Sequence, residues 1–368
     1  MKRILVLKQG CLGGTDRILE DFQKWSEKNK KYIVDVILGS SLSEKGSIIE
    51  RYEYIVSPTS ELCHLWFVKD TSKLIIWSMG HDAVSASFYN KNISNVIYKI
   101  IFKTMHYFFI KSSSIKDSMF FTDHVALHYE LGIDKSCKEK ILPIPINVPK
   151  LNSYRKKKKN AIFWLGRVDR DFKVWSLISL LNILKVLNIK INCEFHIIGE
   201  GNGLDLVKSE LYPFDIIYHG NQPYEDMEKI LVDQAALLCA MGTSALEGAK
   251  LGIPTILINP LYQHEFEEGC SLECRWVYDS KGFSLGEFRL DNINPKQIKS
   301  ELNILLSEFL SDPISISKKS YEYVSAYDRE DVYNKLLESF LIVPDLKSLK
   351  MSLFFSFLSK KIKDIFKK

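Results

Sequence analysis

The residues best suited to ligand binding lie between Ala235 and Asn259, in the sequence AALLCAMGTSALEGAKLGIPTILIN. A short apolar run precedes Gly242, Thr243 and Ser244, which predict a turn and a helix start capped by hydroxyl groups. At the carboxyl end of a parallel sheet, such a helix start could bind an anion such as a diphosphate. Glu247, one turn further on, could accept hydrogen bonds from a ribose or sugar hydroxyl pair. An ordinary capped helix with a solvated acid would give the same pattern.

These residues need a scaffold of alternating strands and helices, and the first half of the chain predicts one. A Gly-rich turn at 10–15 follows the first strand, and a second turn at 80–82 follows another strand. Both turns would lie at carboxyl ends, where open α/β sheets bind ligands. The apolar runs predict strands at 3–8, 32–38, 52–56, 74–79, 119–122 and 141–144, and helices at 16–27, 93–115 and 123–131.

The second half repeats this alternation, which favours an α/β protein with two tandem Rossmann-like, doubly wound domains and an interdomain cleft. Strands are expected at 161–165, 194–198, 215–219, 235–239 and 255–258, and helices at 174–187, 224–232 and 321–340. The expected divisions are an N-terminal acceptor-side domain at 1–149, a hydrophilic linker at 150–160, a nucleotide-binding domain at 161–320, a helix returning to the first domain at 321–345, and a basic amphipathic tail at 346–368.

Composition limits the class of protein. The chain has 368 residues, and its hydrophobic content of 46% suffices for two packed cores. Its seven cysteines lack the paired spacing of a zinc site, so we expect no bound metal and reduced thiols in the cytoplasm. The net charge of +5 is concentrated in the last 23 residues, which hold seven lysines and one aspartate. The near-neutral body argues against nucleic acid as a partner.

Five motifs in order resemble the bacterial glycosyltransferases of the GT-B fold, family four in particular. They are GGTDR at 13–17, GHD at 80–82, LGRVDRDFK at 165–173, IIGEG at 197–201 and LEGAKLGIP at 246–254. The similarity covers about residues 1–340. It implies a nucleotide-sugar donor, a UDP- or GDP-sugar, transferred with retention of configuration and with no metal or other cofactor.

The resemblance also implies roles for individual residues. Arg167 and Lys173, six positions apart, would stabilise the departing diphosphate, the arginine as a bidentate clamp and the lysine as a mobile charge. His81 would reach the donor sugar near the reacting centre. Glu247 would hold the nucleotide ribose. The remaining donor-binding positions are Gly13, Gly14, Gly199, Gly242, Thr243 and Ser244.

Two acidic residues and a cysteine need separate interpretation. Asp169 and Asp171 form a DRD triplet, which we expect to balance the adjacent cations and not to bind metal. Cys239 stands eight residues before Glu247, where the family has the first glutamate of a pair. The residue that normally contacts the transferred sugar is therefore absent. This departure leaves open which sugar the donor carries and whether transfer retains the configuration. The alternative functions are a GT-B-fold sugar-nucleotide epimerase and a noncatalytic, degenerate glycosyltransferase-like binding domain.

The last segment suggests a membrane partner. Residues 346–368 interleave lysines with apolar residues, including Phe354, Phe355, Phe357 and Phe366, at a spacing compatible with an interfacial helix. A packing helix or a disordered basic tail would fit the same composition. The sequence thus predicts a peripheral protein at the inner face of the cell membrane. Its acceptor would be a lipid-linked or oligosaccharide acceptor of bacterial surface polysaccharide, such as O-antigen or capsule.

Overall fold

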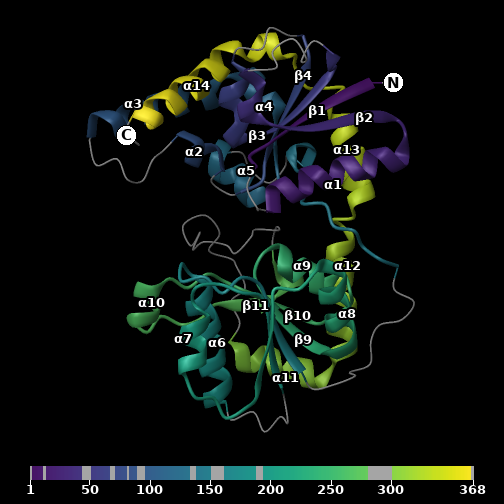
Figure 1. The fold of residues 1–368 in the computed structure, drawn as a ribbon, viewed down its shortest axis with the longest axis vertical. Helices are drawn as coiled ribbons and strands as arrows, with labels where there is room; N and C mark the ends of the chain where they lie inside the picture. Colours follow the sequence, from purple (N-terminus) through teal and green to yellow (C-terminus); the bar gives the residue numbers. More distant parts are fainter. Residues whose placement is uncertain are drawn as a thin grey trace. The chain divides into compact units, whose positions relative to one another are not determined.

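The computed structural model describes residues 2–10, 14–43, 51–66, 71–80, 83–88, 96–132, 138–150, 161–187, 194–280 and 301–365. The chain divides into two compact units (Figure 1). Unit 1 comprises Met1–Pro145 together with Glu330–Lys368, and unit 2 comprises Ile146–Arg329. Each unit is an α/β domain built around its own sheet.

Unit 1 contains a five-stranded sheet in the order β2-β1-β3-β4-β5, and every neighbouring pair is parallel. The inner strands of this parallel sheet are buried on both faces and are therefore nearly continuous apolar runs, whereas the edge strand Tyr32–Leu38 is only partly buried. The strands are β1 (Lys2–Lys8), β2 (Tyr32–Leu38), β3 (Tyr54–Pro58), β4 (Lys73–Ser78) and β5 (Met119–Phe121).

Successive side chains of these strands enter two different cores. Leu5 and Leu7 belong to one cluster of buried residues, whereas Ile4 and Val6 belong to the other. Helices and 3-10 turns complete both layers. They are α1 (Gly14–Asn29), η1 (Gly39–Ser43), η3 (Thr59–Leu65), α2 (Ala83–Phe88), α3 (Val96–Lys111), α4 (Ser113–Ser118), α5 (His124–Leu131), η4 (Lys138–Lys140), α13 (Arg329–Ser339), η6 (Leu346–Leu349) and α14 (Lys350–Ile365).

The C-terminal segments are integral parts of unit 1. On α13, the Tyr333 hydroxyl donates to the backbone oxygen of Ile18 at 3.1 Å, and its ring packs against Phe22 and Trp25. The segment expected to be a tail forms η6 and α14, which lies beside α3 (Figure 1). Leu346, Leu349 and Leu353 are fully buried in the same core as Leu5 and Leu7.

Unit 2 contains a six-stranded sheet in the order β11-β10-β9-β6-β7-β8. All pairs are parallel except the edge pair β10–β11, which is antiparallel. The strands are β6 (Ala161–Leu165), β7 (Phe195–Ile198), β8 (Ile216–Gly220), β9 (Ala235–Ala240), β10 (Thr255–Ile258) and β11 (Cys274–Trp276). The helical segments are α6 (Lys173–Val186), α7 (Leu204–Ser209), α8 (Tyr224–Gln234), α9 (Thr243–Ala249), α10 (Gln263–Glu267), η5 (Val277–Asp279), α11 (Leu302–Ser311) and α12 (Pro313–Ser325).

The chain passes between the units twice, at neighbouring points. Ile146 bridges Asp328 in parallel, and its backbone oxygen accepts from Arg329 N at 2.9 Å. The first domain therefore ends at 145, close to the expected 149, while the second runs to 329 and not to 320. The linker expected at 150–160 lies outside the described residues from 151 onward.

Two expected elements are wrong. Residues 141–144 form no strand, and Ile141 makes only an isolated bridge to Phe121. Pro143 and Pro145 lack the N–H groups that a strand would donate, which explains the loss. The helix expected at 321–340 is interrupted at 326–328, because the backbone there pairs with Ile146.

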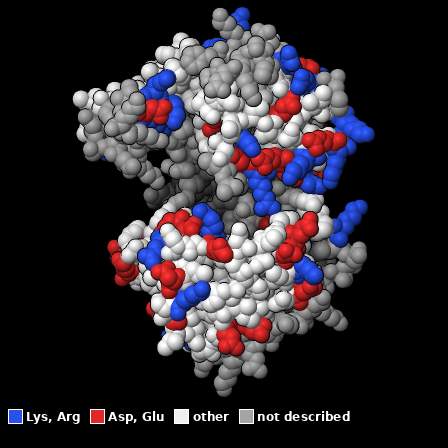
Figure 2. All heavy atoms as spheres, in the orientation of Figure 1, with Lys and Arg blue, Asp and Glu red and all other residues white. Residues whose placement is uncertain are grey.

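Surface charge and helix length give two further observations. Acidic and basic side chains are interspersed on the face of the molecule shown in Figure 2. Within the described residues, none of the helices combines the length and the apolar character needed to cross a bilayer.

Candidate functional site

The carboxyl edge of the unit 2 sheet brings two of the predicted motifs together. β6 and β9 are neighbours, and Leu165 at the end of β6 is paired with Ala240 at the end of β9. The turns that begin at Gly166 and Met241 therefore leave the sheet side by side. This is the edge at which open α/β sheets bind their ligands.

Arg167 lies in the turn between β6 and α6, and Lys173 lies where that turn ends. Arg167 is exposed, and its guanidinium lies 2.6 Å from the Asp169 carboxylate. Lys173 is the first residue of α6, and burial, followed by the nearby Arg167 charge, lowers its pKa. A bound anion beside Lys173 would favour its charged form, which burial and the Arg167 charge disfavour.

The acids of the DRD triplet have partners within the turn. Asp169 pairs with Arg167, and Asp171 accepts from the backbone N–H groups of Phe172 at 2.6 Å and Lys173 at 3.2 Å. Asp171 thus satisfies donors at the start of α6. Among the described residues, no group of three or more His, Cys, Asp or Glu side chains has the arrangement of a metal site.

Helix α9 begins at the adjacent turn, but its cap differs from the prediction. Gly242 is the N-cap residue, with φ of 59° and ψ of −135°, and the helix has no side-chain cap. Thr243 and Ser244 are the first two helical residues, so the expectation that their hydroxyls cap the helix was wrong. The left-handed φ of Gly242 explains why a glycine, and not a hydroxyl residue, occupies the cap. The Ser244 hydroxyl lies beside the β6 turn, 4.0 Å from the position that a Cβ on Gly166 would occupy.

Glu247 lies on α9 in a network that local sequence reasoning missed. Its Oε2 accepts from the Tyr224 hydroxyl at 2.7 Å and pairs with Lys250 Nζ at 2.8 Å. Tyr224 begins α8, 23 residues upstream, so no local spacing could reveal the contact. Lys250 stands three residues after Glu247, a helical spacing that could have suggested a pair.

Cys239 is a core residue. It lies inside β9, opposite Trp164 and Ile256, and is 1% exposed. Only Met241 and Gly242 separate β9 from α9, so no loop is present to carry a carboxylate toward the sheet edge. Burial raises the pKa of this thiol, which keeps it neutral.

Gly199 has a packing role at the same edge. It follows β7, and a Cβ at this position would lie 2.1 Å from the backbone oxygen of Gly166. The turn after β6 can therefore rest directly on the turn after β7. Whether Gly199 also contacts a donor stays a prediction.

Unit 1 has a cavity at the carboxyl edge of its own sheet. Asp16 shapes the first turn there, because its carboxylate accepts from the backbone N–H groups of Gln9 at 3.0 Å and Gly10 at 2.7 Å. The predicted Gly14 begins α1, while Gly13 and His81 lie outside the described residues. The cavity has a volume of about 340 Å³ and is lined by Gln9, Thr15, Pro58, Thr59, Ser60, Met79, Gly80, Ala83 and Ser87.

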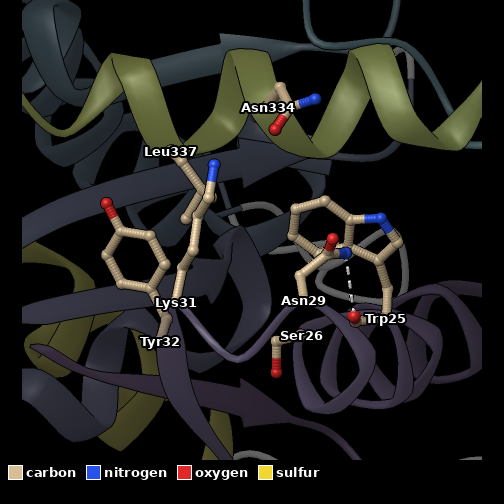
Figure 3. Close-up of a pocket in the computed structure, with 7 residues that line it drawn as sticks. All are labelled: Trp25, Ser26, Asn29, Lys31, Tyr32, Asn334 and Leu337. Carbon is tan, nitrogen blue, oxygen red and sulfur yellow. Dashed lines mark hydrogen bonds between the residues drawn. The ribbon is translucent and has the colours of Figure 1, made fainter. Parts of the chain in front are cut away.

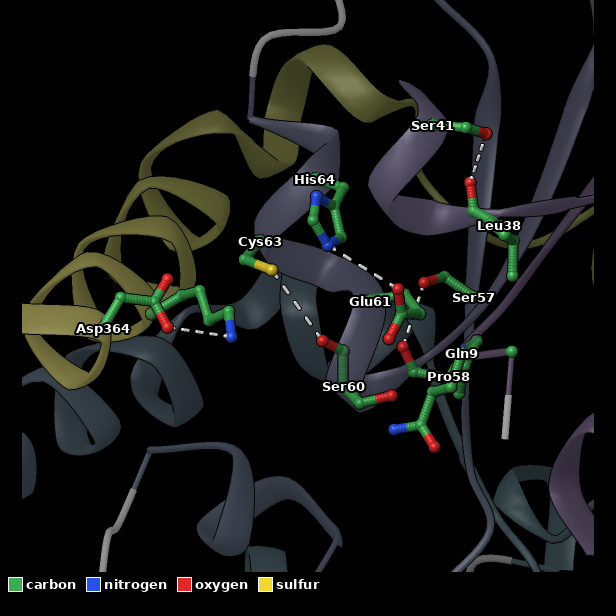
Figure 4. Close-up of polar contacts among 12 residues, drawn as sticks. Gln9, Leu38, Ser41, Ser57, Pro58, Ser60, Glu61, Cys63, His64 and Asp364 are labelled. Atoms are coloured by element: carbon green, nitrogen blue, oxygen red, sulfur yellow. Dashed lines mark hydrogen bonds and ion pairs between the residues drawn. The ribbon is translucent and has the colours of Figure 1, made fainter. Parts of the chain in front are cut away.

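A buried carboxylate lies beside this cavity. Glu61 is 8% exposed, and burial raises its pKa above the ordinary value. His64 on the same 3-10 turn directs Nε2 at Glu61 Oε2 from 3.7 Å, and burial lowers its pKa (Figure 4). Burial thus favours the neutral form of both side chains, whereas a salt bridge would require both to be charged. Sequence reasoning missed Glu61, since nothing in its local pattern distinguishes it from a surface acid.

A second cavity of unit 1 is too small for a sugar. It lies where Trp25, Asn29 and Tyr32 meet Asn334 and Leu337 of α13 (Figure 3). Its volume of about 20 Å³ accommodates no more than a water molecule. It is therefore a packing gap between α1 and α13.

Comparison with known proteins addresses the fold. No family model matches the sequence, and no curated protein does. An α-glucosyltransferase solved with UDP and a 13-mer DNA is 10% identical, with 93% of this chain and 100% of that chain covered and a TM-score of 0.50. TarM is 13% identical over 82% of this chain, with a TM-score of 0.48. The pneumococcal O-GlcNAc transferase GtfA, solved with UDP and GlcNAc, is 14% identical over 83% of this chain, with a TM-score of 0.48.

The chain spans 57% of the length of TarM and 59% of that of GtfA. Its match to the α-glucosyltransferase extends over both units and the whole of that protein. This chain has the GT-B fold. The predicted fold, a pair of Rossmann-like domains, is confirmed.

Proposed function

We propose that the protein is a glycosyltransferase that moves a sugar from a nucleotide-sugar donor to a saccharide acceptor. The observation that carries this proposal is the edge of the unit 2 sheet, where the turn that carries Arg167 and Lys173 adjoins the start of α9, the helix that carries Glu247. Two cations and a helix start suit a diphosphate, and a carboxylate suits the ribose diol attached to it.

The chemistry follows from these charges. The bond between the anomeric carbon and the diphosphate oxygen breaks, and the acceptor hydroxyl forms a new bond to that carbon while its proton passes to the departing diphosphate. Negative charge grows on the leaving oxygen in the transition state. Arg167 and Lys173 would stabilise it there, in a site that needs no reorganisation of water.

We further propose that transfer proceeds with retention of configuration and without a metal ion, as the likeness to family four implies. The metal-free reaction is supported by the engagement of Asp169 and Asp171 within the protein. Activity should survive EDTA treatment, and the anomeric configuration of the product should match that of the donor in an NMR spectrum. Activity lost with EDTA and restored by magnesium or manganese would show that a metal takes part.

The acceptor is proposed to be a lipid-linked saccharide of bacterial surface polysaccharide. The unit 1 cavity supports a saccharide, because Thr15, Thr59, Ser60 and Ser87 line it with hydroxyl groups and Gln9 adds an amide. Sugar hydroxyls are bound by such convergent donors and acceptors.

A lipid partner is supported by the outer face of α3. Five apolar side chains of this helix are between 52% and 67% exposed, namely Val96, Ile97, Ile100, Tyr107 and Phe108. Lys99, Lys103 and Lys111 are exposed among them, and α3 contains no acidic residue. Apolar residues interleaved with lysines suit an anionic lipid surface, to which each lysine contributes about 1 kcal/mol.

This surface replaces the predicted tail as the main lipid contact. Phe354, Phe355 and Phe357 of α14 are half-buried, and Phe355 stacks on Phe108 at 5.8 Å between ring centroids. Phe366 lies outside the described residues. We therefore place the lipid-facing apolar residues on α3, with Lys360 and Lys361 of α14 adding charge.

The catalytic proposal is tested by incubating the protein with labelled UDP-, GDP-, TDP- and CMP-sugars, with and without saccharide acceptors. Release of nucleoside diphosphate together with a glycosylated acceptor supports it. Interconversion of donor sugars without an acceptor would identify an epimerase instead. Neither binding nor turnover of any donor would indicate a noncatalytic domain.

The membrane proposal is tested by sedimentation with vesicles of phosphatidylglycerol and phosphatidylcholine. Replacing Ile97 and Ile100 by Ser should release the protein from these vesicles, whereas Leu341→Ser, at a residue of unit 1 that is even more exposed, should not. Binding should also weaken with salt. Equal sedimentation of all three proteins, or binding to pure phosphatidylcholine alone, would contradict the α3 surface.

A further inference from the structure

Lys250 is the centre of a buried polar cluster at the end of α9. Its side chain is 1% exposed, and Nζ lies 2.6 Å from Glu228 Oε1 and 2.8 Å from Glu247 Oε2. The same ammonium group donates a hydrogen bond to the Tyr224 hydroxyl. Its three N–H groups thus have three partners, from two different helices.

The cluster is balanced in both charge and hydrogen bonding. A buried ammonium group is costly without a counter-ion, and here two carboxylates face it. The Tyr224 hydroxyl accepts from Lys250 and donates to Glu247. Burial, with the nearby Glu247 charge, raises the pKa of Tyr224, so the hydroxyl keeps the proton that it donates. The hydrogen bonds form a closed network, which holds its members in one geometry.

Both contacts to Glu247 use the same oxygen. Tyr224 and Lys250 engage Oε2, and no contact within the described residues engages Oε1. The carboxylate is only 17% exposed, and it lies on the helix that starts at the carboxyl edge of the sheet. Its orientation is therefore fixed while one oxygen retains its capacity to accept hydrogen bonds.

We propose that Tyr224 and Lys250 are positioning residues that orient Glu247 Oε1 to accept hydrogen bonds from the ribose hydroxyls of the donor nucleotide. The protein would thereby prefer ribonucleotides to 2′-deoxyribonucleotides. This inference rests on the proposed nucleotide-sugar function and adds to it the residues that set sugar selectivity in the nucleotide. A site built to bind a hydroxyl discriminates against an analogue that lacks it.

The test is calorimetric binding of UDP and 2′-deoxy-UDP, and of GDP and 2′-deoxy-GDP, to the full-length protein. The wild type should bind the ribonucleotide of one pair about tenfold more tightly, equivalent to about 1.4 kcal/mol. Tyr224→Phe and Lys250→Met should bring this ratio close to one while leaving the affinity for the 2′-deoxy form nearly unchanged. Glu247→Gln should change the ratio in the same direction.

The ratio of the two affinities separates a positioning role from a general loss of structure, because misfolding would weaken the binding of both nucleotides equally. Tyr212→Phe is the matched control, since its buried hydroxyl has no hydrogen-bond partner among the described residues. It should keep the wild-type ratio. If Lys250→Met does not fold, the affinity ratio of Tyr224→Phe is sufficient to test the positioning role, because this variant removes only a single hydroxyl.

The outcomes also separate this inference from the proposed function. If the wild type binds neither pair of nucleotides, the nucleotide-sugar function fails and the inference fails with it. If it binds them without preference for ribose, or if Tyr224→Phe keeps the wild-type ratio, the positioning role is wrong while the proposed function stands.

Discussion

At the scale of single residues, the proposed mechanism depends on two cations, Arg167 and Lys173. Replacing either by Ala should lower turnover of a nucleotide-sugar donor by a factor of about 100, as the loss of one preorganised charge does in other active sites. The effect should fall mainly on kcat, because the leaving charge develops in the transition state. Steady-state kinetics of the two variants would measure it.

The same turn offers a matched control. Arg170 is exposed, lies three residues after Arg167, and pairs with Asp205 at 2.5 Å. Arg170→Ala removes an equal charge without touching the proposed diphosphate position. If the Ala variants of Arg167, Lys173 and Arg170 all had the same reduced turnover, the loss would reflect the net positive charge of the turn and not specific contacts with the diphosphate.

Glu61 predicts a pH-dependent effect on stability. Burial raises its pKa above 4.5, the ordinary value, so the folded protein binds this proton more tightly than the unfolded chain. Stability therefore falls as pH rises through the window that begins near 4.5. Glu61→Gln removes this loss, so the variant should exceed the wild type in free energy of unfolding at neutral pH, with the difference shrinking toward acid.

Urea denaturation of both proteins across this range measures the difference. Glu53→Gln, at an exposed acid of the same unit, provides the control. A wild type and Glu61→Gln variant whose difference is independent of pH would mean that Glu61 ionises in the folded protein as it does in the unfolded chain.

What the sequence reveals of the site depends on how far apart the cooperating residues lie. Arg167 stands in a strand-to-helix turn, and Lys173 and Glu247 stand near the starts of helices that follow such turns. Their recognisable spacing let the sequence single them out. Tyr224 and Lys250 become meaningful only when α8 and α9 pack together. Burial of a lone acid such as Glu61 is likewise a property of the folded chain.

At the scale of elements, α14 and η6 supply core residues to unit 1. Leu349 is fully buried in the cluster that contains Leu5 and Leu7. Leu349→Ala should therefore cost about 2–5 kcal/mol in free energy of unfolding. Met351→Ala should cost little, because Met351 is 69% exposed on the same segment. Chemical denaturation of the two variants tests the packing role, and equal stabilities would contradict it.

The expected and the observed bounds of the strands and helices show where prediction of elements succeeds. Strands β6 and β10 match the expected ranges residue for residue, because strands buried on both faces are short apolar runs. The edge strand β2 also matches, because its sequence is apolar although it is only partly buried. The strand expected at 141–144 fails because prolines remove its donors. The role of α14 was ambiguous because an interfacial helix and a packing helix share one amphipathic pattern.

At the scale of the whole molecule, the two units differ in how the chain builds them. Unit 2 is one continuous segment, Ile146–Arg329, whereas unit 1 needs both ends of the chain. The core of unit 1 includes Val332, Tyr333 and Leu336 from α13 and three buried leucines that follow. A division near residue 150 alone, as the composition suggests, would separate those side chains from the strands they cover.

This asymmetry predicts different behaviour of fragments. Residues 146–329 expressed alone should fold cooperatively, whereas residues 1–145 alone should not, because they lack the C-terminal part of their core. Joining residue 145 to residue 330 through a short Gly-Ser linker should restore folding, since Arg329 N bonds to Ile146 O at 2.9 Å and the two crossing points are adjacent. Circular dichroism and thermal melts of the three proteins measure this. A folded 1–145 fragment, or a linked protein that stays unfolded, would mean that the C-terminal helices do not complete unit 1.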